Sequence, residues 1–131
     1  MGTSYFVGRN DQEAVKVDLY YTDPFMQPLL ETEGIRLATV EEILAMKLDV
    51  IGRGGRKKDF WDIYAFMDDY SLSEMIQLHH QRYPYSHDRE IITRNIVTVD
   101  DADNDFDPSC LRGEYWELIK YDLGNWARIT D

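Results

Sequence analysis

Hydrophobic residues between positions 40 and 51 recur at the spacing that places side chains on one face of a helix. They are Val40, Ile43, Leu44, Leu48 and Ile51. Thr39 precedes this stripe and Glu42 follows three residues later, which is the spacing of a capping box, in which each side chain accepts a hydrogen bond from the backbone N–H of the other residue. The pattern therefore predicts a helix that begins at Thr39 and buries this face.

Similar apolar periodicity predicts four more helices in the rest of the chain. They are expected over residues 59–66, 71–83, 88–99 and 115–126. Ser71 and Glu74 repeat the capping-box spacing, and Pro84 ends the third of the five helices because proline cannot continue a helix.

Alternating polar and apolar residues near the N-terminus predict strands. Ser4–Arg9 and Val15–Tyr21 are joined by the turn-forming residues 10–13, so we expect them to form a β-hairpin. A loop over Thr22–Leu30 and a short strand over Ile35–Ala38 lead into the first helix. The sequence therefore predicts an α+β fold, with a short N-terminal β-hairpin followed by a bundle of about five helices.

The composition suits one globular domain, since the chain has 131 residues of which 44% are hydrophobic. We expect a single domain over residues 1–131 that is β-rich over 1–38 and helical over 39–131. The one cysteine, Cys110, excludes an internal disulfide and suits a reducing cytoplasm. The sequence has no apolar run of membrane-spanning length and no signal-peptide pattern, so we expect a cytoplasmic protein without membrane contact.

The net charge of −11 argues against broad binding to nucleic acid, which requires a basic surface. The turn after the first helix nevertheless holds four of the 14 basic residues: Arg53, Arg56, Lys57 and Lys58. Lys47 lies near the middle of the apolar arc of that helix, where an ammonium group needs a partner. Asp59 and Asp62 share one face at the start of the second helix. Together these residues predict a site for an anionic ligand.

Each of these features also has a structural interpretation. Lys47 can pack its aliphatic stem on the core and keep its ammonium in water. Asp59 fits an N-cap, and Asp62 fits an acidic residue stabilised by the helix dipole. The basic turn fits an ordinary solvated loop. The residue pattern alone leaves both interpretations open.

This region resembles the C-terminal part of the AbiEii/AbiGii toxin family of bacterial nucleotidyltransferases. The resemblance lies in two stretches, VKVDLYYTDPF and EEILAMKLDVIGRGGRKKDFWDIYAFM. In that family a strand ends in a VD pair, a helix carries an A-x-K motif, and a basic turn leads into a KDF-x-DIY motif. The match covers residues 15–84 and extends more weakly to the C-terminal helix. It implies a partial nucleotidyltransferase-like domain.

The resemblance implies transfer of a nucleotide from an NTP to an RNA or protein acceptor, by the toxin of a toxin–antitoxin or phage-defence pair. It implies that Lys47 contacts the triphosphate and that Asp59 and Asp62 position this lysine or the acceptor, with Asp62 the stronger candidate for a proton acceptor. The four basic residues of the turn would attract phosphate. Asp18 would be the third carboxylate at the Mg²⁺ ions of a complete family member.

The metal-binding motif of such enzymes is a Gly-Ser or Gly-Gly turn followed by Asp-x-Asp, and no Asp-x-Asp precedes Val15 in this sequence. We therefore expect the chain to correspond to the C-terminal part of a family member and to be inactive in transfer by itself. Two alternatives are a non-catalytic module that binds a nucleotide or partner, and a structural remnant. The expected partners are an NTP, an antitoxin protein, a tRNA or other RNA acceptor, and a second copy of the chain paired through the N-terminal strands.

Two other groups of residues are interpreted structurally. His79 and His80 are adjacent and point about 100° apart on a helix, so we expect them at the helix surface and the edge of the core rather than at a metal site. The acidic run over residues 103–107 has the carboxylate spacing of a calcium loop, but Pro108 stands where that loop needs glycine. We therefore expect a solvated acidic linker.

Overall fold

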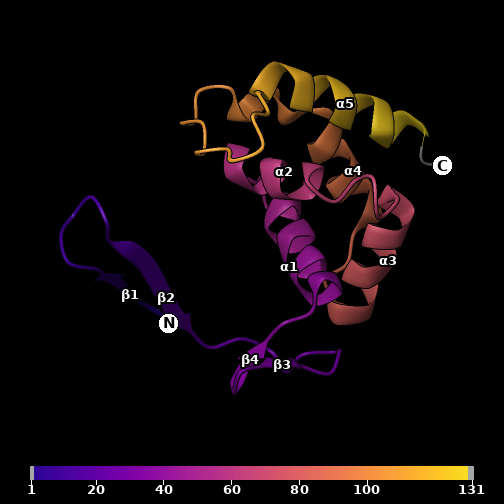
Figure 1. Cartoon of the computed structure of the whole chain (residues 1–131). Coiled ribbons are helices and arrows are strands. Elements are labelled where there is room, and N and C mark those ends of the chain that lie inside the picture. Colours follow the sequence, from indigo (N-terminus) through magenta and orange to yellow (C-terminus); the bar gives the residue numbers. More distant parts are fainter. Residues whose placement is uncertain (1, 130–131) are drawn as a thin grey trace.

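The computed structural model describes residues 2–129, in which four short strands precede five α-helices and one 3₁₀-helix (Figure 1). The strands are β1 (Gly2–Val7), β2 (Val15–Tyr20), β3 (Leu30–Thr32) and β4 (Ile35–Leu37). The helices are α1 (Val40–Gly52), α2 (Lys57–Tyr64), α3 (Leu72–Arg82), α4 (Arg89–Val97), the 3₁₀-helix η1 (Val99–Ala102) and α5 (Trp116–Ile129). This order confirms the predicted α+β class.

The ends of the helices differ from the predicted positions by up to three residues, and two of these differences have an identifiable cause. α2 begins at Lys57 rather than Asp59, because the Asp59 carboxylate accepts a hydrogen bond of 2.9 Å from the backbone N–H of Arg56 and makes Arg56 the N-cap. The fourth predicted helix is divided into α4 and η1 at Thr98, whose hydroxyl donates to a backbone carbonyl one turn earlier. Such a bond from a threonine side chain to the helix backbone competes with continuation of the helix.

A second hairpin, β3–β4, lies between the first hairpin and α1. The connecting residues Glu33 and Gly34 have φ angles of 52° and 79°. Positive φ at both central positions is the conformation of a tight two-residue hairpin turn, in which glycine is unstrained. β3 was not expected from the sequence, because a three-residue strand is too short to show an alternating pattern.

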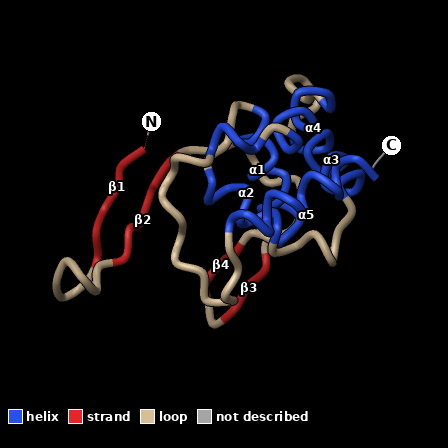
Figure 2. The backbone as a smooth tube through the Cα atoms, turned by 90° about the horizontal axis from the view of Figure 1, so that it is seen from above, coloured by secondary structure: helices blue, strands red, loops and turns tan. Residues whose placement is uncertain are grey.

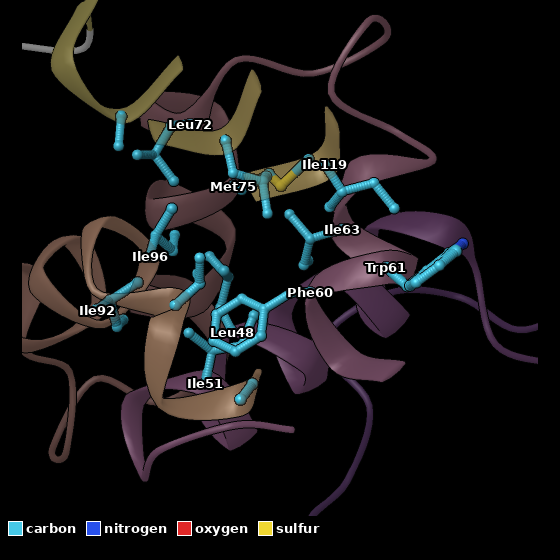
Figure 3. Packing of buried hydrophobic residues seen from close by; sticks show 14 of the residues in the cluster. Leu48, Ile51, Phe60, Trp61, Ile63, Leu72, Met75, Ile92, Ile96 and Ile119 are labelled. Carbon is cyan, nitrogen blue, oxygen red and sulfur yellow. The ribbon is translucent and has the colours of Figure 1, made fainter. Parts of the chain in front are cut away.

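The helices share one hydrophobic core arranged around α1, which packs against α2, α3 and α4, while α5 covers α2 and α4. Figure 3 shows Leu48 and Ile51 of α1 meeting Phe60 of α2 and Ile92 of α4 in this core. No helix within residues 2–129 combines the length and hydrophobicity needed to cross a membrane. The core therefore fixes α1 and α2, which carry most of the predicted site residues.

The β1–β2 hairpin extends away from the helical body (Figures 1 and 2) and every residue of both strands is exposed. The register pairs Thr3 with Leu19, Tyr5 with Val17 and Val7 with Val15, so these six side chains lie on the same face. One face of the hairpin is therefore almost entirely apolar and open to solvent.

A buried ion pair between Arg82 of α3 and Glu42 of α1 joins these two helices and anchors the segment between β2 and β3. The Arg82 guanidinium also donates to the Thr22 hydroxyl at 3.0 Å and to the carbonyls of Asp23 and Pro24 at 3.4 Å. The predicted capping box at the start of α1 is consequently only half formed. Thr39 accepts from the Glu42 N–H, but the Glu42 carboxylate binds Arg82 and the backbone N–H of Gln27 instead of Thr39.

We expect Arg82→Met to lower the free energy of unfolding by about 3–5 kcal/mol, because it leaves the buried Glu42 carboxylate without its counter-ion. Adding Glu42→Gln to this variant removes the unpaired charge and should restore part of the loss. Arg94→Met, which alters an exposed arginine on α4, is the matched control and should change stability by less than about 0.5 kcal/mol. Urea unfolding followed by circular dichroism measures all four proteins; equal losses for the two single arginine variants would contradict the assigned role of Arg82.

Candidate functional site

The turn between α1 and α2 places the predicted site residues of the two helices next to each other. The N–H groups of Gly54 and Gly55 donate to the carbonyls of Ile51 and Val50 at 3.0 and 3.1 Å and close the end of α1. Gly55 has a φ of 67°, and a Cβ there would lie 3.1 Å from the Phe60 ring. Glycine at this position therefore lets α2 turn back onto α1.

Lys47 of α1 meets both aspartates of α2. Its Nζ lies 3.3 Å from Asp59 Oδ1 and 2.7 Å from Asp62 Oδ2. The Lys47 side chain is 27% exposed and its ammonium has two acidic partners, as its place within the apolar arc of α1 requires. Asp59 is buried and its other oxygen is held by the N–H of Arg56, whereas Asp62 is 57% exposed.

The two aspartates keep Lys47 protonated. Partial burial lowers the pKa of Lys47, but the hydrogen bond and charge of Asp62, followed by those of Asp59, outweigh burial and raise the pKa above its ordinary value. Lys47 is therefore a fixed cation near neutral pH, suited to binding an anion and not to accepting a proton.

Lys47 lines a cleft of about 830 Å³ between the end of β2 and α1. One wall consists of residues 20–23, and the other contains Ile43, Met46, Lys47, Asp49, Val50 and Arg53; Tyr83, which follows α3, also lines the cleft. An adjoining hollow of about 650 Å³ shares Tyr20, Val50 and Arg53 with this cleft. The second hollow is also lined by Asp18, Arg56, Lys58 and Asp59. The two form one continuous surface that carries most of the predicted site residues.

The structure separates Lys57 from the other three basic residues of the turn. Its Nζ is buried against Trp116, 5.1 Å from the ring centroid, and donates to Asp107 Oδ1 at 2.9 Å and to the Asp103 carbonyl at 3.1 Å. This position leaves Lys57 outside the cleft, so its place does not fit the expected role in phosphate binding.

The acidic run is accordingly not the solvated linker expected from the sequence. The Asp105 carboxylate accepts from the backbone N–H of Lys57 at 3.1 Å, and the Asp103 carboxylate accepts from Trp116 Nε1 at 2.7 Å. Asp107 binds the Lys57 ammonium. The run closes over the N-terminus of α2 and attaches it to α5.

Asp18 faces the second hollow but has no carboxylate partners suited to a metal site. It accepts a hydrogen bond of 2.6 Å from the Ser4 hydroxyl and lies 3.7 Å from Lys16 Nζ. The Ser4 hydrogen bond, more than the charge of Lys16, holds the pKa of Asp18 below its ordinary value. Within residues 2–129 no three His, Cys, Asp or Glu side chains are grouped as metal ligands. These residues alone therefore do not fit a magnesium site.

His79 is a core residue that the sequence analysis placed at the edge of the core. It is 3% exposed, and its Nε2 lies 3.2 Å from Asp49 Oδ1 while its Nδ1 lies 2.7 Å from His87 Nδ1. Its spacing from Leu72, Met75 and Ile76 along α3 puts it on the apolar face, and this signal could have identified it as buried. Nothing in the pattern indicated its pairing with His87.

Comparisons with known proteins give one match. The family model described as nucleotidyl transferase AbiEii toxin, Type IV TA system, matches residues 2–123. No curated protein and no solved structure matches the chain.

The environments of the two aspartates predict different effects on stability. Asp59→Ala should lower the free energy of unfolding by about 2 kcal/mol, because it removes a buried acceptor of a backbone N–H and one partner of Lys47. Asp62→Ala removes the same charge from an exposed position of the same helix and should cost less than about 0.5 kcal/mol. Urea unfolding of both variants measures the difference, and equal losses would show that Asp59 does not fix the α1–α2 junction.

Proposed function

The chain belongs to the AbiEii family of nucleotidyl transferase toxins, and from this premise we propose that its cleft binds the triphosphate of a nucleotide. The observation that carries the proposal is the position of Lys47, a partly covered cation on the cleft wall that also contains Arg53. Phosphate oxygens bind most strongly to charged donors held in place before the ligand arrives. Arg56 and Lys58 extend this cationic wall into the adjoining hollow.

Asp59 and Asp62 have different parts in this proposal. Asp59 is held by the Arg56 N–H and keeps Lys47 in position, whereas the exposed Asp62 is a partner that a phosphate group can displace. Once displaced, the exposed Asp62 carboxylate beside Lys47 is free to accept a proton from the hydroxyl of an RNA or protein acceptor.

Transfer needs more than these residues provide. In phosphoryl and nucleotidyl transfer, Mg²⁺ held by carboxylates stabilises charge that develops on the phosphate oxygens. Because the described residues do not gather such a ligand set, we propose that this chain by itself binds nucleotide and does not transfer it. The second candidate is a module that binds a nucleotide and has no part in transfer even within a larger protein. The lack of a metal-ligand set among the described residues favours this candidate as well.

The proposed biological setting is the cytoplasm, with the chain as the toxin component of a toxin–antitoxin or phage-defence pair. An antitoxin protein and an RNA acceptor are proposed partners. The open apolar face of the β1–β2 hairpin also supports association with a second copy of the chain, because exposed strand edges and apolar faces pair readily.

Nucleotide binding is tested by titrating labelled ATP into the chain and its variants. We expect weak binding that decreases at high salt, about tenfold weaker binding by Lys47→Ala, and equal or tighter binding by Asp62→Ala. Arg94→Ala, which removes one positive charge outside the cleft, is the control and should bind like the unmodified chain. Equal affinities of the Lys47 and Arg94 variants would contradict the proposed site.

Incubation with labelled NTPs and total RNA or protein tests the second part of the proposal. We expect no labelling of an acceptor by the chain alone. Strong labelling that is lost in the Lys47→Ala variant would show that the chain is a complete transferase and would overturn the binding-only proposal.

Self-association is tested by light scattering over a range of concentrations. We expect the mass of the unmodified chain to rise with concentration and Val17→Lys, on the apolar face, to abolish the rise. Phe6→Lys introduces the same charge on the opposite face of the hairpin and should leave association intact. A constant monomer mass for the unmodified chain would exclude the dimer.

A further inference from the structure

The three histidines of the sequence lie together where α3 approaches the start of α4. The buried His79 contacts Asp49 of α1 on one side and His87 on the other. His80 stacks on His87 with ring centroids 4.7 Å apart and, unlike His79 and His87, is exposed. Asp49, His79 and His87 thus form a hydrogen-bonded chain from a buried position to the surface.

The chemistry of the partners fixes the direction of these hydrogen bonds. A carboxylate can only accept, so Nε2 of His79 donates to Asp49. In neutral His79 the other nitrogen, Nδ1, then carries no hydrogen and accepts from Nδ1–H of His87 at 2.7 Å. Both tautomers follow from the contact with Asp49.

Asp49 connects this chain of hydrogen bonds to the proposed binding cleft. Its Oδ2 lies 3.2 Å from an Arg53 guanidinium nitrogen, and its carbonyl accepts from Arg53 Nε at 3.4 Å. Asp49 and Arg53 both line the cleft. Arg53 is 73% exposed, so Asp49 is the contact that restricts where its guanidinium lies.

We propose that His79 and His87 are positioning residues that act through Asp49 on Arg53, and that they make anion binding in the cleft depend on protonation of the histidine pair. The proposal rests on the proposed function, because it assigns a regulation to the same cleft. A protonated His79 binds Asp49 more strongly as an ion pair, which draws the carboxylate away from Arg53 and frees the guanidinium for a phosphate group.

The geometry limits the pair to one added proton. When one proton is added, His79 carries hydrogens on both ring nitrogens and donates from Nδ1 to Nδ1 of His87. His87 is then neutral, with its hydrogen on Nε2 instead of Nδ1. With two protons, two N–H donors would face each other at 2.7 Å, and the contact would break. The pair therefore acts as a single proton-binding unit.

Burial keeps the pair neutral in the free protein near pH 7. Desolvation lowers the pKa of His79 in spite of Asp49, and desolvation followed by the charges of His79 and His80 lowers the pKa of His87. The other titratable and charged groups that face the pair come from α1 and its turn, from α3, and from the start of α4. They are Asp49, Arg53, His80, Tyr83, Asp88 and Arg89.

The sign of the effect follows from linkage. A bound anion favours the protonated pair, so binding takes up a proton and affinity rises as the pH falls below the ordinary histidine value of about 6.5. A lowered histidine pKa also means that the folded state loses stability as the pH falls from 6.5 toward that lowered pKa, and the ligand should offset part of this loss.

The test is calorimetric titration of inorganic triphosphate at pH 7.5 and pH 6.0 into the unmodified chain and three variants. Each titration is repeated in two buffers of different ionisation enthalpy to count the protons taken up. His79→Gln retains a donor for Asp49 but cannot be protonated, and His87→Gln removes the outer member of the pair. His80→Gln removes a neighbouring histidine that lies outside the hydrogen-bonded chain, and serves as the matched control. Because the charge of His80 lowers the pKa of His79 and His87, this variant should keep at least the pH dependence of the unmodified chain. At each pH the protonation of the probe is the same for all four proteins, so differences between proteins belong to the chain.

We expect affinity to rise more between pH 7.5 and 6.0 for the unmodified chain and His80→Gln than for His79→Gln and His87→Gln, by up to about threefold, which is the limit for one added charge acting through solvent. Proton uptake should fall in the same two variants. Should His79→Gln fail to fold, His87→Gln, at a half-buried position, carries the test. Binding with the same pH dependence and proton uptake in all four proteins would overturn this inference alone. No binding by the unmodified chain at either pH would overturn it together with the proposed function.

Discussion

The burial of charged groups is the constraint on which this structure depends. Within residues 2–129 the buried polar and charged side chains are Glu42, Lys57, Asp59, His79 and Arg82. Each has a partner on a different element or segment of the chain, because a buried charge without a partner costs several kcal/mol. Hydrophobic packing brings the helices together, and these pairings fix α1, α2 and α3 against one another and against the segments that precede α1 and follow η1.

The same pairings shape the cleft. Arg82 holds Thr22 and Asp23, which form part of one wall, and its partner Glu42 belongs to α1, which forms the other. Asp59 fixes Lys47 within that second wall and also starts α2. The exposed Asp62 and Arg53 are held only by contacts at the surface. A rigid frame therefore carries a few polar side chains that can change partners when an anion arrives.

The local patterns in the sequence predicted the helices, because capping residues and apolar periodicity act within a few positions. They also predicted that Lys47, Asp59 and Asp62 lie close together, since the turn between their helices is short. Contacts between distant residues could not be predicted in this way. Glu42 and Arg82 are 40 positions apart and Lys57 and Asp107 are 50 apart. In the sequence Lys57 is one of four basic residues in a turn, and only the tertiary structure shows that it faces the acidic run and not the cleft.

The chain has a net charge of −11, and four of its basic side chains line the cleft and the adjoining hollow, a distribution that affects the kinetics of encounter. A polyphosphate approaching from a distance meets overall repulsion, and attraction begins only within a Debye length of Lys47 and its neighbours. Added salt therefore accelerates arrival by screening the repulsion, while it hastens departure by weakening the local contacts. The association and dissociation rate constants should therefore both increase with ionic strength. For a basic protein, in contrast, the association rate constant for a polyanion falls as salt is added.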